Sequence, residues 1–137
     1  MRAAASLLAL LALAGCATPP PETTRILFTG ETLGRLAACI CDGRLAGGLA
    51  YRRAFLAGQG RGCLLVDTGN AACGAGEQQR LQARSVLAEM QAMGYAAMNL
   101  GEEEAALGPA GIAELAAVGL PLLSANLVDR QGRGLGR

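Results

Sequence analysis

Short apolar runs alternate with longer segments of helical periodicity through most of this sequence. Four runs have the length and apolar character of strands: 25–29, 63–67, 95–100 and 120–127. Three segments between them carry apolar residues at helical spacing: 45–57, 77–93 and 108–118. Gly94 is a suitable helix stop, and Pro109 lies where a helix tolerates proline, in its first turn.

The order of these strands and helices predicts how the strands pair. A strand, helix, strand succession implies an α/β fold with a mainly parallel sheet, right-handed crossovers and flanking helices. Leu65, in the middle of the second run, is expected to be fully buried. Ligands of such sheets bind at the carboxyl ends of the strands. The loops after Thr29, Asp67 and Leu100 are therefore the candidate functional loops.

The first residues have the pattern of a secretion signal. Arg2 precedes an apolar stretch, 3–13, that is too short to span a bilayer comfortably, and small residues lead to Cys16. The sequence Leu-Ala-Gly-Cys at 13–16 resembles the lipobox of bacterial lipoproteins, which implies a signal peptide at 1–15 and acylation, including palmitate, of Cys16. The alternative is an ordinary signal peptide with Cys16 as a stray thiol.

The lipobox interpretation also predicts how the chain is divided into segments and where the protein lies in the cell. Residues 16–23 are a Pro-rich tether, and 24–137 form the folded domain. Ala17 follows the acylated residue, which in Gram-negative lipoproteins usually goes with sorting to the outer membrane. The expected location is therefore the periplasmic face of the bacterial outer membrane, with the membrane as a partner through the lipid anchor.

Composition excludes several kinds of chemistry. The 12 basic residues are all arginine, they form no basic run, and they are balanced by 11 acidic residues, so nucleic acid is not an expected partner. The sequence contains no histidine, which removes the commonest general base and the commonest neutral metal ligand. Any chemistry must therefore come from carboxylates, thiols, amides or arginine.

Sequence blocks around the candidate loops resemble those of a known family. The blocks are GGLA at 47–50, LLVDTG at 64–69, MGYAAMNLG at 93–101 and PLLSANL at 121–127. Their order and spacing resemble the N-terminal portion of the metallophosphoesterase domain in the 5'-nucleotidase and UDP-sugar hydrolase family. The resemblance implies a partial metallophosphoesterase-like domain at 24–137. It also implies two divalent metal ions as cofactors.

The residues that the resemblance places at the metal site are not the family's ligands. The family's first aspartate corresponds to Glu31, its histidine to Leu33 and its bridging aspartate to Asn70. Its Asn-His pair corresponds to Glu102 and Glu103, and further histidine ligands would lie beyond residue 137. Glu31, Asn70, Glu102 and Glu103 are thus weak candidates for a hard ion such as Mg²⁺, Mn²⁺ or Ca²⁺. The competing interpretation is that acids at 102–104 complement the dipole of a helix start.

Four cysteines beyond Cys16 are a second chemical signal in an exported chain. Cys39, Cys41 and Cys73 follow predicted strands and are expected at one sheet edge, whereas Cys63 starts a strand at the opposite edge and is expected to be reduced. Cys73 is expected to pair with Cys39 or Cys41, leaving a thiol for exchange or a soft metal. This Cys-rich segment also resembles a divergent branch of the family, the UshA-like (seleno)proteins.

Three hypotheses about function follow from the sequence. The first is a degenerate or truncated homologue without hydrolase activity of its own. The second is a thiol-based redox or soft-metal-binding module, and the third is a phosphohydrolase completed by a missing C-terminal half or a partner subunit. A lone four-stranded sheet would expose an apolar face, so a further part of the chain or a partner subunit is expected to cover it. The catalytic residues and any substrate stay open.

Overall fold

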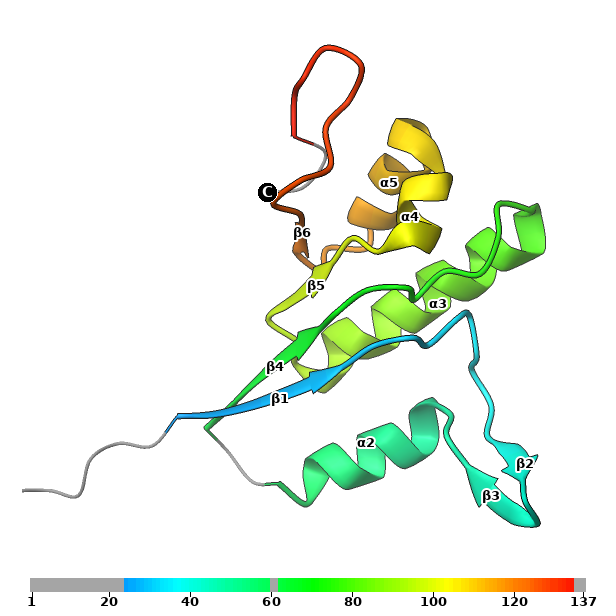
Figure 1. The fold of residues 1–137 in the computed structure, drawn as a ribbon. Coiled ribbons are helices and arrows are strands. Elements are labelled where there is room, and N and C mark those ends of the chain that lie inside the picture. The colour runs from blue at the N-terminus through cyan, green and yellow to red at the C-terminus, as the bar shows by residue number, and fades with distance from the viewer. Residues whose placement is uncertain (1–23, 60–61, 135–137) are drawn as a thin grey trace, which may run out of the picture.

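Four parallel strands form the central sheet of the molecule (Figure 1). The computed structural model describes residues 24–59 and 62–134, apart from the side chain of Cys41. The strands are β1 (Arg25–Thr29), β4 (Cys63–Asp67), β5 (Ala97–Asn99) and β6 (Leu122–Leu123). Their order in the sheet is β1-β4-β5-β6, and every neighbouring pair is parallel. The predicted α/β fold class is therefore confirmed.

In the part of the chain that the structure describes, four helices connect and flank these strands. They are α2 (Leu49–Ala57), α3 (Glu77–Met93), α4 (Glu102–Ala106) and α5 (Gly108–Ala116). Helix α3 has the predicted bounds, and Gly94 ends it with the left-handed φ of 88° that a helix-terminating glycine commonly adopts. The last two strands are shorter than predicted, because only 97–99 and 122–123 of the apolar runs pair with a neighbour.

A hairpin replaces part of the predicted loop and helix after β1. Strands β2 (Cys39–Cys41) and β3 (Arg44–Ala46) pair antiparallel, and Asp42 and Gly43 between them have φ of 50° and 72°. Positive φ at both central positions is typical of the type I′ turn that joins tight hairpins. The predicted helix at 45–57 was therefore wrong at its start. Gly47 and Gly48, with φ of 73° and 79°, separate β3 from α2.

The hydrophobic core lies between the sheet and the helices α3 and α5. Its most deeply buried large apolar side chains come mainly from these helices and from β5: Val86, Leu87, Met90, Met98, Leu115 and Leu120. Leu65 is only half-buried, so the prediction that it is fully buried was wrong. The reason is local: a cavity of about 430 Å³ beside β4 is lined by Leu65, Leu56 and Met93.

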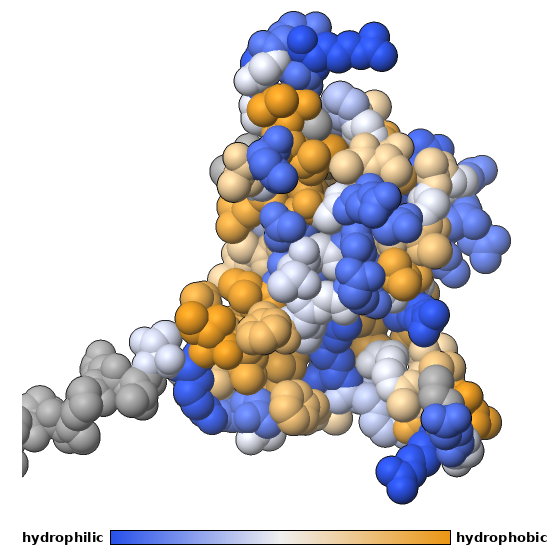
Figure 2. Space-filling view, in the orientation of Figure 1, coloured by the Kyte–Doolittle hydropathy of each residue, from blue (hydrophilic) through white to orange (hydrophobic). Residues whose placement is uncertain are grey.

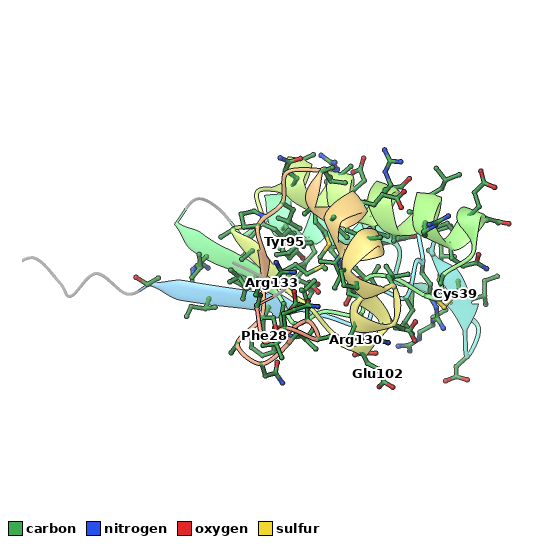
Figure 3. The ribbon with its side chains drawn as sticks, turned by 90° about the horizontal axis from the view of Figure 1, so that it is seen from above. Phe28, Cys39, Tyr95, Glu102, Arg130 and Arg133 are labelled. Atoms are coloured by element: carbon green, nitrogen blue, oxygen red, sulfur yellow. The ribbon has the colours of Figure 1, made fainter. Side chains whose placement is uncertain are left out.

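The opposite face of the sheet carries no covering element among the described residues. Ile26, Phe28, Leu64 and Leu123 are 58%, 73%, 41% and 41% exposed on that side. Figure 2 views this side and shows hydrophobic residues gathered over β1 and β4 and again toward β6. In Figure 3, Phe28 lies on the side of the sheet away from α3, whereas Tyr95 lies on the helix side. The apolar face expected of a lone sheet is therefore present.

The predicted signal peptide, tether and acylated Cys16 fall at 1–23, outside the described residues. Within 24–59 and 62–134, no helix has both the length and the apolar composition needed to cross a bilayer.

Candidate functional site

Three loops meet at the carboxyl edge of the sheet, as the parallel topology predicts. Backbone hydrogen bonds join the loop after β1 to the loop after β4. Glu31 N donates to Gly69 O at 3.0 Å, and Leu33 N donates to Asn70 O at 2.8 Å. Glu31, Leu33 and Asn70 have φ of 54°, 50° and 58°. A cluster of non-glycine residues with positive φ is uncommon and is typical of functional loops.

The third loop approaches so closely that two positions require glycine. A Cβ atom at Gly69 would lie 2.7 Å from Gly101 N, and Gly69 has a φ of 108°. A Cβ atom at Gly101 would lie 2.2 Å from Asn70 Oδ1. Both distances are far shorter than a van der Waals contact, so a side chain at either position would collide with an atom of the neighbouring loop. The two glycines therefore permit the loops after β4 and β5 to touch.

Glu104 fastens these loops together. Its side chain is completely buried, and its two carboxylate oxygens accept three backbone N–H groups. The donors are Asn70 at 2.9 Å, Ala72 at 2.8 Å and Gly101 at 2.9 Å. A buried carboxylate needs such charge-assisted hydrogen bonds to offset its lost hydration. The sequence pattern places Glu104 only at a helix start and gives no sign of this role.

The weak metal candidates are engaged in hydrogen bonds with one another and with the loops. Asn70 Nδ2 donates to Glu31 Oε1 at 2.7 Å, and Asn70 Oδ1 accepts the backbone N–H of Glu103 at 3.1 Å. The Glu103 carboxylate accepts the N–H of Gly74 at 3.1 Å, and Glu102 is exposed (Figure 3). In the described part of the chain, no three His, Cys, Asp or Glu side chains gather as a metal site would require.

A buried polar network lies directly beneath the loops. Asp67, at the end of β4, accepts the Thr29 hydroxyl through Oδ2 and the Gly69 N–H through Oδ1. The Thr29 hydroxyl also lies 2.9 Å from the Tyr95 hydroxyl. These contacts fix the ends of β1 and β4 relative to each other. In the sequence, Asp67 stands out only as the end of a predicted strand, so its place in this network was not predicted.

Arg52 of α2 connects this network to the loop after β1. Its Nη2 donates to Thr32 Oγ1 at 2.8 Å, and its Nη1 lies 3.9 Å from Asp67 Oδ2. Within the described residues, this Nη1 is a buried nitrogen without a hydrogen-bond partner. The Asp67 carboxylate therefore lies at ion-pair distance from a guanidinium nitrogen that makes no hydrogen bond to the described residues.

Two cysteines from different elements line one cavity. A cavity of about 460 Å³ is bounded by Cys39 of β2 and Cys73 of the loop after β4, together with Arg35, Gln79 and Gln82. Cys73 is an exposed free thiol, so the expected disulfide at Cys73 is not formed in the structure. Cys63 is free and half-buried in the separate cavity beside Leu65, as expected. The side chain of Cys41 lies outside the described residues.

No protein-family model and no curated protein matches this sequence. Several solved structures match its fold. The NAD nucleotidase NadN of Haemophilus influenzae has a TM-score of 0.62 and 21% identity over 78% of this chain. The calcineurin-like phosphoesterase YfkN of Bacillus subtilis has a TM-score of 0.61 and 22% identity over 80% of it. A 5'-nucleotidase precursor of Thermus thermophilus has a TM-score of 0.60 and 25% identity over 81% of it.

The matched region is a part of each of these longer proteins. This chain spans 21%, 38% and 24% of the respective chains. All three proteins are nucleotidases or phosphoesterases by name, and each match covers about four fifths of this chain. The described residues therefore have a 5'-nucleotidase-like metallophosphoesterase fold, over the N-terminal portion of such a protein.

Proposed function

We propose that this chain is a metallophosphoesterase-like domain with a degenerate metal site and without phosphohydrolase activity of its own. The hydrogen bonding of Asn70 carries this proposal. The family resemblance places a metal-bridging aspartate at this position, and a bridging residue must offer negative oxygens to two cations. Asn70 is neutral, and its amide already joins Glu31 to the backbone of Glu103. The side chain thus holds the loops together in place of a metal pair.

The neighbouring positions do not fit two divalent ions either. Leu33 corresponds to a histidine ligand, and its side chain has no atom that binds a metal. The Glu31 carboxylate is already partnered by Asn70 at 2.7 Å, and Glu102 is exposed to solvent. Carboxylates that remain would hold a single hard ion weakly at most.

The proposal is tested by metal-dependent hydrolysis. We expect the purified chain to release no phosphate from 5'-nucleotides, and no UMP or sugar 1-phosphate from UDP-sugars, when Mn²⁺, Mg²⁺ or Zn²⁺ is added. We also expect its melting temperature to be unaffected by Mn²⁺ and Mg²⁺. Turnover that depends on Mn²⁺ and disappears in Glu31→Gln would overturn the proposal. Turnover that requires an added longer homologue or partner would instead support the hypothesis of a hydrolase completed by another chain.

We further propose that Cys16 is acylated and attaches the domain to the periplasmic face of the outer membrane. The lipobox and the Pro-rich tether at 16–23 support this assignment. In a Gram-negative host, the wild-type protein should fractionate with the outer membrane, and Cys16→Ser should release it from that fraction and alter its gel mobility. A Cys16→Ser protein that stays in the outer membrane with unchanged mobility would contradict lipid attachment.

The shared cavity of Cys39 and Cys73 favours thiol chemistry as a second candidate function. Thiolates bind soft metal ions strongly, and Cys73 is exposed and forms no disulfide in the structure. Addition of Cd²⁺ should give the ultraviolet charge-transfer absorption of a cadmium thiolate in the wild type. That absorption should be lost in Cys73→Ser and retained in Cys63→Ser, because Cys63 lies in the other cavity. Equal loss in both variants would remove the basis for this candidate.

A further inference from the structure

The cavity that Cys39 and Cys73 share is built beside α3. Its described walls come from the loop segment 33–37, from Cys39 of β2, from Cys73 after β4, and from Gln79 and Gln82 of α3. Helix α3 packs on the side of the sheet opposite the uncovered face (Figure 3). Among the described residues, none from the uncovered face lines this cavity. Its chemistry can therefore be considered apart from whatever covers that face.

Gly34 brings a thiol and an amide to the same point of the cavity wall. A Cβ atom at Gly34 would lie 3.7 Å from Cys73 Cβ and 3.6 Å from Gln82 Oε1. The backbone is fixed here, because Gly34 N donates to Ala71 O at 2.7 Å. Gln82 is half-buried, whereas Cys73 is exposed. The exposed thiol thus has a polar hydrogen-bonding group held beside it.

Arg35 gives the cavity a positive charge. Within 24–59 and 62–134, the Arg35 guanidinium makes no ion pair, and the described residues that line the cavity include no Asp or Glu. The Glu103 carboxylate lies near the loop of Cys73, where it accepts the Gly74 N–H. A guanidinium without a carboxylate partner favours a negatively charged ligand, and a carboxylate can bind it through two parallel hydrogen bonds.

We propose that this cavity binds a small disulfide that carries carboxylate groups, and that Cys73 forms a mixed disulfide with one half of it. The proposal rests on the thiol chemistry given above as the second candidate function, and it names the substrate class. The volume of about 460 Å³ lies in the usual range for small-molecule sites. Small disulfides are compatible with the oxidising compartment that the secretion signal predicts.

The reaction is a single thiol–disulfide exchange. Cys73 gives its proton to water, and the thiolate attacks one sulfur of the small disulfide. A new S–S bond to Cys73 forms while the original S–S bond breaks, and the other half leaves as a thiolate that takes up a proton from water. Cys73 is oxidised and the leaving half is reduced. The small disulfide is thus the oxidant, and the step needs no other.

Rates of adduct formation with two small disulfides of opposite charge test the proposal. Oxidised glutathione carries carboxylates and is anionic, whereas cystamine is cationic. Peptide mass spectrometry of the full chain follows the adduct at each cysteine. At Cys73, the ratio of the glutathione rate to the cystamine rate should fall at least roughly threefold in Arg35→Gln at low ionic strength, because the Arg35 charge attracts one probe and repels the other.

The chain offers a matched control for the arginine and another for the thiol. Arg130 is also exposed but lines a different cavity, so Arg130→Gln removes the same charge and should keep the wild-type ratio at Cys73. Cys63 lies in a cavity whose arginine, Arg53, is paired with Glu89. The ratio measured at Cys63 should therefore not depend on Arg35. Circular dichroism should confirm that each variant is folded.

Two results would overturn the proposal: a wild-type chain that forms no adduct at Cys73, and a ratio that Arg35→Gln leaves unchanged or that Arg130→Gln lowers equally. Cadmium binding needs thiolates but no positive charge. A cadmium signal together with an unchanged ratio would therefore reject this exchange site and leave the second candidate function standing. Neither measurement depends on the proposed loss of hydrolase activity.

Discussion

Three consecutive glutamates have three different environments at the start of α4. Glu102 is exposed, Glu103 accepts one backbone N–H from the neighbouring loop, and Glu104 is completely buried beneath the loops. In the sequence they are equivalent acids at a helix start, and the helix dipole favours all of them. Their difference arises from the direction in which each side chain leaves the helix and from the loop packed against it.

Glu104→Gln should lower the free energy of unfolding by roughly 2 to 4 kcal/mol, since an amide nitrogen then faces backbone N–H donors in a buried site. Glu102→Gln is the matched control and should change stability by less than about 0.5 kcal/mol, because Glu102 is exposed. Urea unfolding followed by circular dichroism measures both. Similar values for the two variants would show that Glu104 does not hold the loops.

Asn70→Asp tests whether the loops need a neutral amide beside Glu31. The substitution replaces an amide donor 2.7 Å from Glu31 Oε1 with a second carboxylate, so the two negative charges should destabilise the protein by roughly 1 to 2 kcal/mol. A divalent cation between them would relieve the repulsion. Mn²⁺ should therefore raise the melting temperature of Asn70→Asp but not that of the wild type. Asn126→Asp, at an exposed position, should show no Mn²⁺ dependence.

The elements that depend on local signals could be predicted from the sequence. The bounds of β1, β4 and α3 agree with the apolar runs, the helical spacing and the helix-terminating Gly94. The hairpin could not be predicted, because Leu45 fits the apolar pattern of a helix as well as that of a strand. In the structure Leu45 lies in strand β3, which ends just before Gly47 and Gly48. The length of β6 depends on its pairing with β5, which is a property of the sheet.

Two leucines that look alike in the sequence differ in how completely their side chains are packed. Leu87 of α3 is completely buried in the core, and Leu65 of β4 is half-buried beside a cavity. Leu87→Ala should cost about 2 to 5 kcal/mol of stability because it creates a new cavity in a packed region. Leu65→Ala should cost less, about 1 to 2 kcal/mol, because part of its surface is already unpacked. Thermal or urea unfolding compares them directly, and an equal cost would contradict the observed difference in packing.

At the scale of the whole molecule, the position of the candidate site was predictable and its bonding was not. Parallel strands require that the loops after β1, β4 and β5 emerge at one edge, and these loops do touch. The network of Thr29, Asp67 and Tyr95 joins residues up to 66 positions apart. No local pattern in the sequence indicates such a contact. The same holds for Cys39 and Cys73, whose shared cavity depends on how the hairpin packs beside the loop after β4.

The distribution of the core predicts which parts of the molecule open first. Deeply buried side chains concentrate on α3, β5 and α5, whereas every described side chain of the hairpin β2–β3 is exposed. Local opening requires little free energy where few apolar contacts are lost. Amide hydrogen exchange should therefore be slowest in α3 and β5. In the hairpin it should be faster by at least about a thousandfold, which corresponds to roughly 4 kcal/mol of opening free energy. Equal protection of hairpin and α3 amides would mean that the hairpin opens only when the entire domain unfolds, and that the strand carrying Cys39 is as rigid as the central sheet.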